Sequence, residues 1–334
     1  MDMEYNILCC NVGRRGRLML DFRRSLAGKG KVVGTDNWSV APALFLADKM
    51  YVVPKIRDRS YLETVLDICE KESIKAVATF IDPEIELLSA HREVFLSRGI
   101  LPLCPSEHTA HLCFDKYELF KHLRDRGVRT VLTYRTLADF RAGLAKGEIS
   151  FPVFIKPVTG SGSVGARRVD DLETLEELFA AGAHDYIIQE LMTEGDCDAD
   201  VYVDCLSHEV VSVFCKRKIE TRIGGASKTV SFKDPALFDF VKEVCAVLEL
   251  SGPCDMDFFL KDGQWCLSEI NPRFGGAYLH AYGAGVDFMK YILRNIDGQA
   301  NAPEIGCYDE GVLMLMYDDV VITKESELLR DYHE

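Results

Sequence analysis

The stretch that most restricts the fold of this sequence is PCDMDFFLKDGQWCLSEINPRFGG, residues 253–276. Two apolar runs flank Asp262-Gly263, a pair that strongly predicts the two-residue turn of a β-hairpin. Because side chains alternate along a strand, Asp255 and Asp257 share one face, as do Glu269 and Asn271 on the second strand. The turn allows residue 257 to pair with residue 268 or 269, and pairing with 269 brings all four side chains together.

This hairpin raises an electrostatic problem, because like charges that face each other across two strands destabilise the pairing. Nearer the turn, the same register would place Phe259, Trp265 and Leu267 on the acidic face. A divalent cation with oxygen ligands would neutralise the carboxylates, and Mg²⁺ held by one or two carboxylates plus substrate phosphates fits this pattern. The alternative is a solvated strand edge whose charges point outward.

A glycine-rich segment, IKPVTGSGSVG, occupies residues 155–165. Its glycines allow backbone N–H groups to close on a phosphate. It is not a Walker A loop, because Lys156 precedes the glycines and no Gly-Lys-Ser/Thr follows them. We expect a lid over phosphates with Lys156 on its entry strand, and the alternative is a surface hairpin.

Lys116 lies in the first turn of a predicted helix that opens with Asp115 and Glu118, the spacing of a capping box. The helix dipole disfavours a cation at this end. A bound triphosphate would explain the lysine, and a solvated helix lysine is the alternative.

The order of predicted elements indicates an α/β protein. Strand and helix patterns alternate through the first hundred residues, which predicts a parallel, doubly wound domain. Within it, Asp82 and Pro83 open a helix as N-cap and first helical residue. From residue 199 the pattern becomes antiparallel, and the C-terminal tail has the composition of one or two further strands.

Together these motifs resemble the ATP-grasp superfamily over roughly residues 4–300, most closely the group of the carbamoyl phosphate synthase large subunit. The resemblance rests on a helix with Lys116, FIKP followed by the glycine loop, a QEL strand, and DMD followed by EINPR. It implies an ATP-grasp fold divided into a Rossmann-like pre-ATP-grasp domain (1–110), a small lid subdomain with N-terminal helices (111–190), a large subdomain with the metal site (191–305) and a C-terminal strand or tail (306–334).

The resemblance also implies roles for individual residues, with ATP and Mg²⁺ as cofactors and Mn²⁺ as an alternative metal. Asp257, Glu269 and Asn271 would hold the metal. Arg273 and Lys156 would act in catalysis, with Arg273 facing the γ-phosphate and the acyl phosphate. The nucleotide-binding residues would be Lys116, Lys156, Gly160, Ser161, Gly162, Ser163, Val164, Gly165, Gln189, Glu190 and Leu191, with Asp198, among Asp196, Asp198 and Asp200, favoured for the ribose.

The implied reaction is carboxylate activation. ATP would phosphorylate a small carboxylate to an acyl phosphate, and an amine would then attack it to form an amide or peptide-like bond, with ADP and phosphate released. One unit without a repeat or glutaminase segment favours a stand-alone carboxylate–amine ligase. Two alternatives remain, namely a nucleotide-binding regulator without turnover and a kinase that releases the acyl phosphate.

Other residues are weaker candidates. Arg217, Lys218 and Arg222, like Arg273, would face the substrate, with Arg217 favoured, although charged strand residues are usually solvated. The turn NVGRRG, with Gly13 and Gly16, resembles an anion-binding strand-to-helix turn, but a plain tight turn explains it as well. His280 and Tyr282 would line the substrate site or belong to the core.

Composition limits the partners. With 39 basic and 53 acidic residues the net charge is −14, which disfavours nucleic acid and anionic membranes as partners. The twelve cysteines show no recurring C-x-x-C spacing and the N-terminus does not resemble a signal peptide, so a reducing, cytoplasmic location is expected. The expected partners are therefore small carboxylates and amines, and self-association remains open.

Overall fold

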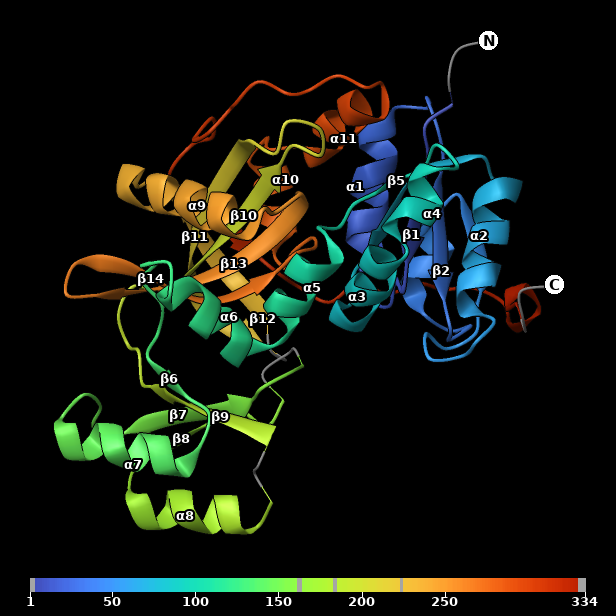
Figure 1. Cartoon of the computed structure of the whole chain (residues 1–334). Helices are drawn as coiled ribbons and strands as arrows, with labels where there is room; N and C mark the ends of the chain where they lie inside the picture. Colours follow the sequence, from blue (N-terminus) through green and yellow to red (C-terminus); the bar gives the residue numbers. More distant parts are fainter. Residues whose placement is uncertain (1–3, 161–163, 183–184, 223–224, 330–334) are drawn as a thin grey trace.

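The structure, a computed structural model, describes residues 4–160, 164–182, 185–222 and 225–329. Its described strands form three sheets, which lie in three parts of the molecule (Figure 1). The N-terminal part is on the right of Figure 1, the largest sheet is at the upper left, and a small lid extends below it. The expected α/β class is therefore confirmed.

The N-terminal sheet is parallel throughout, with strand order β3-β2-β1-β4-β5. One apolar cluster, which includes Phe22, covers one face, and another, which includes Tyr61 and Leu88, covers the other, as predicted for a doubly wound domain. Its elements are β1 (Asn6–Cys10), α1 (Gly16–Leu26), β2 (Val32–Asp36), the 3₁₀ helix η1 (Pro42–Leu46), β3 (Lys49–Val52), α2 (Tyr61–Lys71), β4 (Ile74–Thr79), α3 (Asp82–Ala90), α4 (Arg92–Leu96) and β5 (Leu101–Pro102).

The second sheet is antiparallel, with strand order β14-β13-β10-β11-β12-β15. Its strands are β10 (Cys197–Val203), β11 (Val210–Arg222), β12 (Gly225–Phe232), β13 (Gly252–Lys261), β14 (Gln264–Asn271) and β15 (Leu313–Leu315). Helix α9 (Pro235–Leu248) buries its apolar side on one face of this sheet. Helices α10 (Tyr278–Gly283) and α11 (Phe288–Ile296) share a core cluster with α1, so the N-terminal domain and the large sheet are packed together.

The predicted hairpin of β13 and β14 is present, and its register pairs Asp257 with Glu269 and Asp255 with Asn271. The expectation for the apolar tip was wrong. The register shifts between Asp257 and Phe258, so that Phe258 pairs with Leu267. This β-bulge leaves Ser268 without a partner on β13 and reverses the facing of β14 alone, so Trp265 and Leu267, but not Phe259, pack in the core cluster with helix α9 instead of on the acidic face.

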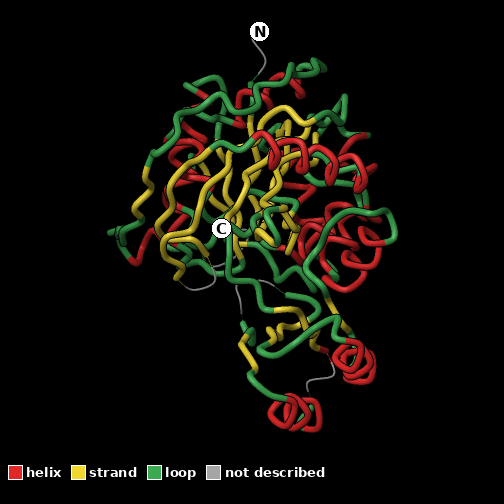
Figure 2. The backbone as a smooth tube through the Cα atoms, turned by 90° about the vertical axis from the view of Figure 1, so that its left-hand side faces the viewer, coloured by secondary structure: helices red, strands yellow, loops and turns green. Residues whose placement is uncertain are grey.

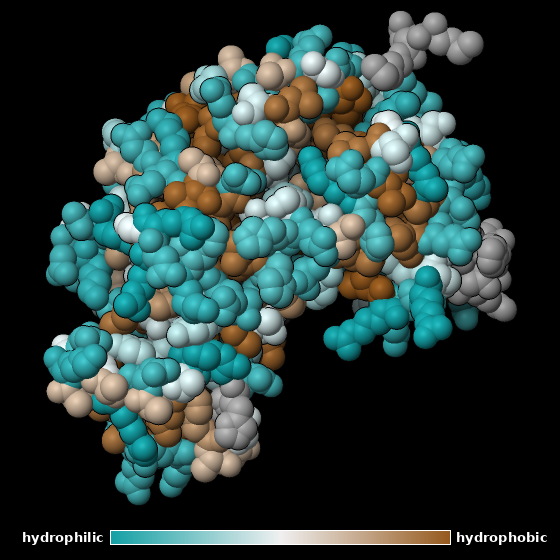
Figure 3. All heavy atoms as spheres, viewed as in Figure 1, coloured by the Kyte–Doolittle hydropathy of each residue, from teal (hydrophilic) through white to brown (hydrophobic). Residues whose placement is uncertain are grey.

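The lid contains a four-stranded sheet of order β6-β9-β7-β8 and two helices (Figure 1). Its elements are β6 (Thr133–Tyr134), α7 (Leu137–Lys146), β7 (Val153–Pro157), β8 (Arg167–Val169), α8 (Leu172–Ala180) and β9 (Tyr186–Glu190). Phe140, Leu175 and Ile188 belong to its separate core. Figure 2 shows the lid projecting from the rest of the chain, and Figure 3 shows a broad concavity between the lid and the N-terminal domain.

Two helices, α5 (Glu107–Phe114) and α6 (Lys116–Arg124), connect the N-terminal domain to the lid. The Asp115 carboxylate caps α6 by accepting hydrogen bonds from the backbone N–H groups of Tyr117 and Glu118, both at 2.9 Å, as the sequence predicts. Asp82 behaves differently from the prediction. Helix α3 begins at Asp82 itself, and the carboxylate accepts a hydrogen bond from a distant arginine. In the described part of the chain no helix is long and apolar enough to cross a membrane.

A buried side-chain amide connects helix α11 to the end of β10 and the turn that follows it. Asn295 is 3% exposed. It accepts hydrogen bonds from the Tyr202 hydroxyl at 2.8 Å and the Cys205 N–H at 3.1 Å, and donates one to Asp204 Oδ2 at 2.9 Å. We predict that Asn295→Ala destabilises the protein by about 2–4 kcal/mol, because buried partners lose their hydrogen bonds.

Urea unfolding would measure this loss. The matched control is Asn37→Ala at an exposed position, with an expected change within about 0.5 kcal/mol. Equal stability of the two variants would contradict the assigned role of Asn295.

Candidate active site

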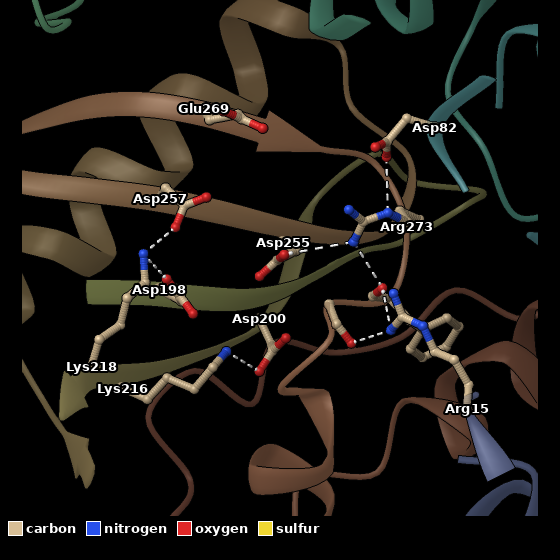
Figure 4. Close-up of polar contacts among 12 residues, drawn as sticks. Arg15, Asp82, Asp198, Asp200, Lys216, Lys218, Asp255, Asp257, Glu269 and Arg273 are labelled. Atoms are coloured by element: carbon tan, nitrogen blue, oxygen red, sulfur yellow. Dashed lines mark hydrogen bonds and ion pairs between the residues drawn. The ribbon is translucent and has the colours of Figure 1, made fainter. Parts of the chain in front are cut away.

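One face of the large sheet carries acidic and basic side chains in neighbouring rows (Figure 4). The register pairs Asp198 with Asp257 and Asp200 with Asp255. On the other side of β10, Lys216 is the partner of Asp198. Alternation along each strand then places Lys216 and Lys218 on the same face as the four aspartates. The described face thus combines the predicted carboxylates with two lysines from β11. We call these six side chains the charge cluster.

The lysines neutralise the carboxylates at short range. Lys218 Nζ lies 2.5 Å from Asp257 Oδ1, 2.7 Å from Asp198 Oδ1 and 2.9 Å from Asp196 Oδ1. Burial opposes the charge of Lys218, but these carboxylates outweigh it and raise its pKa. Burial likewise opposes ionisation of Asp257, yet Lys218 lowers its pKa below the ordinary value. In Asp198 burial prevails, with help from Asp257, and raises the pKa.

Lys216 and Asp200 form a second pair, with Nζ and Oδ2 2.6 Å apart and exposures of 0% and 1%. Burial opposes the charge of Lys216, but Asp200 raises its pKa. Asp255 is held less tightly. Burial, reinforced by the charges of Asp257 and Asp200, raises its pKa to about 6.

Two lysines reach the same region from outside the sheet. Lys156 on β7 places Nζ 3.2 Å from Glu269 Oε2, and Lys116 at the start of α6 places Nζ 4.0 Å from Glu269 Oε1. Lys116 also donates a hydrogen bond to the Gly160 carbonyl at 2.6 Å. Burial lowers the pKa of Lys116. The two lysines predicted from the sequence thus meet the carboxylate at the end of β14.

These residues line a pocket between β14, the lid and the N-terminal domain. Lys116, Gly160, Glu269 and Asn271 supply polar atoms, and Asp82 lies at its edge. The apolar wall is formed by Ile85, Ala110, Cys113, Phe114, Ile270 and Pro272. A pocket with a lysine, carboxylates and an amide, whose Glu269 also pairs with Lys156, suits an anion that carries a metal ion.

Glu269 and Asn271 fit a magnesium ion because both offer oxygen ligands to this pocket from alternate positions on β14. No group of three or more acidic, histidine or cysteine side chains among the described residues forms a complete metal site. The residues therefore fit a metal that also takes oxygens from phosphates. Asp257 would join only after Lys218 releases it.

The glycine loop is described only at its ends. Gly160 and Gly165 have φ angles of +106° and +78°, which favour glycine, and Val164 is 79% exposed. Ser161, Gly162 and Ser163 lie outside the described residues.

The predicted hinge connects β9 of the lid to β10 of the large sheet. Gln189 donates to Thr133 Oγ1 at 2.8 Å, and Glu190 accepts from the Leu132 N–H at 2.9 Å and pairs with Lys261. Leu191 begins the connection to β10. The side chains of Gln189 and Glu190 thus anchor the segment to its surroundings.

The three candidates for a ribose contact differ in burial. Asp198 and Asp200 are 6% and 1% exposed, within the charge cluster. The Asp196 side chain is 43% exposed. Asp196 is therefore the most exposed of the three, whereas Asp198, which the sequence favoured, is buried, and the ribose contact stays a prediction.

Several predicted residues lie away from the charge cluster. Arg217 points to the opposite face of β11, over the Phe232 ring at 5.9 Å, because strand side chains alternate. Arg222 is exposed at the end of β11. His280 is buried between Thr229 Oγ1 at 2.7 Å and the Val312 carbonyl at 3.0 Å, and burial lowers its pKa to about 4.

Sequence reasoning named Lys218 only as a substrate-side candidate, ranked it below Arg217, and did not assign Lys216 to the site. The signal was the alternation in CKRKI, in which residues 216 and 218 share a face that excludes 217.

The N-terminal turn also differs from an open anion site. Its Gly13 N–H donates to Asp36 Oδ2 at 2.8 Å, so the protein's own carboxylate takes the anion position. Tyr282 lies at α1, where its hydroxyl accepts from Ser25 at 3.3 Å.

Two family models match the chain. A PylC-like N-terminal domain matches residues 7–103, and an ATP-grasp domain matches residues 113–277. The chain belongs to the ATP-grasp superfamily. The ATP-grasp match includes Lys116, Lys156, the charge cluster and Arg273, and the resemblance inferred from the sequence is confirmed.

Relatives of this ATP-grasp chain include a formate-dependent phosphoribosylglycinamide formyltransferase from Sulfurovum sp. (strain NBC37-1), 25% identical over 265 residues. A carbamoyl phosphate synthase large chain from Thermoplasma acidophilum is 23% identical over 246 residues. The matches cover 73% and 68% of this chain but only 64% and 23% of the relatives, less than two thirds of their length.

Among solved structures, the L-amino acid ligase from Bacillus licheniformis matches with a TM-score of 0.67 at 20% identity. The match covers 89% of this chain and 75% of the ligase. At this identity the likeness establishes the ATP-grasp fold.

We predict that Lys218→Met destabilises the protein by about 2–3 kcal/mol at pH 7, because it leaves partly buried carboxylates without their cation. The effect should shrink as the pH falls below about 4. The pKa of Asp257 is lowered in the folded state, so its pairing stabilises the fold above the unfolded pKa and is lost as the pH falls through the folded pKa.

Urea unfolding at pH 7 and pH 2.5 would measure both effects, because the contribution of Asp257 declines only below its unfolded pKa of about 3.9. Lys228→Met, which removes an exposed lysine paired with Glu220 at 2.8 Å, is the control and should leave stability unchanged. A loss at pH 2.5 as large as that at pH 7 would contradict the electrostatic role of Lys218.

Proposed function

We propose that this chain is an ATP- and Mg²⁺-dependent carboxylate–amine ligase. The observation that carries the proposal is that Lys116 and Lys156 both reach Glu269, a residue that lines the pocket of an ATP-grasp chain. The γ-phosphate of ATP passes to a small carboxylate to give an acyl phosphate. An amine then displaces the phosphate to form a C–N bond, with ADP and phosphate as the other products.

We assign nucleotide binding to Lys116 and Lys156, whose ammonium groups exchange Glu269 for phosphate oxygens. The backbone of Gly160–Gly165 covers the phosphates, and the hinge Gln189–Leu191 contacts the adenine through its backbone. Glu269 and Asn271 would hold Mg²⁺, or Mn²⁺, and Asp257 would complete the ligands once free of Lys218. The metal supplies charge neutralisation to the phosphates.

Arg273 is assigned to the transferring phosphoryl group, because its planar fork suits phosphoryl and carboxylate oxygens. It is 9% exposed and adjoins the pocket through Asn271 and Pro272. Burial opposes its charge, but Asp82 and Asp255 raise its pKa, so the guanidinium stays protonated. Preorganised cations in such a site stabilise developing charge, which is the main requirement of phosphoryl transfer.

The activities for which the relatives are named support a carboxylate and an amine as substrates. One is named a formate-dependent phosphoribosylglycinamide formyltransferase, and one structural neighbour is an L-amino acid ligase. We therefore propose small molecules of these classes as substrates. All twelve cysteines are unpaired, which supports a reducing compartment such as the cytoplasm.

The first test is a screen for ADP release with Mg²⁺·ATP and amino acids, alone and in pairs. We predict ADP and phosphate together with a product linked by a new C–N bond, measured by chromatography and mass spectrometry. Glu269→Gln should bind nucleotide weakly and lose turnover. AMP and pyrophosphate as products would contradict the proposal, and an unlinked acyl phosphate would identify a kinase.

We further predict that Arg273→Lys lowers kcat by about 10²-fold or more, because it keeps the charge but loses the two-pronged donor. MgADP affinity, measured by calorimetry, should stay near the wild-type value, since the contact strengthens in the transition state. A collapse of MgADP affinity with kcat preserved would instead make Arg273 a ground-state anchor of the nucleotide.

A further inference from the structure

The side chain of Arg273 is held by a residue of the N-terminal domain. Arg273 Nε donates a hydrogen bond to Asp82 Oδ1 at 2.9 Å, although the two residues are 191 positions apart (Figure 4). Nη1 donates to the carbonyl of Phe274 at 3.1 Å and lies 3.7 Å from Asp255 Oδ2. Nη2 has no hydrogen-bond partner among the described residues. The anchored atoms fix the plane of the guanidinium and leave one nitrogen for an incoming oxygen.

A second residue of the N-terminal domain holds the backbone that follows. Arg15, at the turn before α1, donates hydrogen bonds from Nη1 to the Gly275 carbonyl at 2.8 Å and the Phe274 carbonyl at 3.4 Å. Its guanidinium also lies over the Phe80 ring at 5.5 Å. Burial, together with the charge of Arg273, lowers the pKa of Arg15 to about 10, so it remains charged at neutral pH.

The same segment is fixed by packing. The Phe274 ring is 1% exposed and contacts Phe22 of α1, with centroids 5.0 Å apart, and Phe80 after β4, at 6.3 Å. Gly275 has no room for a side chain, because an added Cβ would lie 2.7 Å from Asp255 Oδ1 and 2.9 Å from Asp200 Oδ1. Residues 273–275 are therefore enclosed between the N-terminal domain and the charge cluster.

The turn that carries Arg15 is itself rigidly tied. Gly13 N–H is bonded to Asp36, and the Asn11 amide donates to Glu84 Oε2 at 2.6 Å. These bonds use the polar groups of the turn inside the domain. The turn contributes only the Arg15 side chain to the contact with residues 274 and 275. This contact gives a role to the NVGRRG motif, which nucleotide binding does not explain.

From these contacts we propose that Asp82 and Arg15 are positioning residues for phosphoryl transfer. Asp82 orients the guanidinium of Arg273, and Arg15 fixes the backbone on which Arg273 stands. The N-terminal domain thereby contributes to the reaction centre through the position of Arg273. The part of this inference that concerns rate rests on the proposed function of Arg273, whereas the part that concerns the fixed segment does not.

The first experiment needs no substrate. Hydrogen–deuterium exchange of the full chain would be followed in peptides spanning residues 270–278 for Asp82→Ala and Arg15→Gln. We expect exchange in these peptides to rise several-fold while distant peptides keep wild-type rates. The matched controls are Glu86→Ala, on the same helix but facing His111, and Arg14→Gln, the exposed neighbour of Arg15. Unchanged exchange, or a rise equal to that of the controls, would overturn the proposal.

The second experiment uses the amino-acid substrates found in the ADP-release screen. Asp82→Ala should lower kcat by about 10- to 100-fold, because small misplacements of a reacting group are costly. MgADP affinity should change less than about twofold, since the residue acts only in the transition state. Adding Asp82→Ala to Arg273→Lys should cost almost nothing further, because the two residues act as one unit.

The outcomes separate this proposal from the proposed function. Independent, multiplicative losses in the double variant, or an unchanged kcat in Asp82→Ala, would show that Asp82 does not act through Arg273. If the wild-type protein releases no ADP with any amino acid, the assigned reaction fails, and the exchange measurement alone decides whether the N-terminal domain fixes residues 273–275.

Discussion

The structure depends on the pairing of lysines with carboxylates across one face of an antiparallel sheet. Four aspartates on two adjacent strands would repel each other strongly enough to oppose that pairing. Lys216 and Lys218 enter from the third strand and lie 2.5–2.6 Å from their closest carboxylate partners. The carboxylates of the hairpin are therefore neutralised by lysines of the same sheet before any ligand binds.

This arrangement defines what the sequence could and could not predict. The Asp262-Gly263 turn identified the hairpin and reduced its register to two alternatives, one of which the structure has, and the order of motifs identified the fold and the family. The sequence analysis expected a metal ion to neutralise the carboxylates of the hairpin and did not give this role to Lys218. Strand β11, which carries Lys218, is separated from the hairpin by strand β10. Local alternation cannot show which face of one strand meets which face of another. The bulge at Asp257–Phe258 was equally hidden, since no glycine or turn residue marks it.

The contacts of Asp82 were also beyond local reasoning. The pair Asp82-Pro83 predicts the start of a helix, and this local pattern says nothing about a distant partner of the Asp82 carboxylate. Its actual partner, Arg273, comes from another part of the fold, and only the packing of α10 and α11 on α1 brings them together. Long-range ion pairs of this kind carry no periodic signal in the chain.

The same packing explains why the N-terminal domain accompanies the nucleotide-binding part in one chain. The segment after β14 carries Arg273, yet its aromatic ring, its carbonyls and its guanidinium are all held by residues from the first 82 positions. A loop of this length would otherwise sample many conformations, and each would present the arginine differently to the transferring group. Enclosing it between two domains removes that freedom during folding, so no free energy of substrate binding is needed to order it. The turn with Arg15, whose sequence resembles an anion-binding site, therefore binds no anion itself. It holds the backbone of residues 274 and 275 next to Arg273.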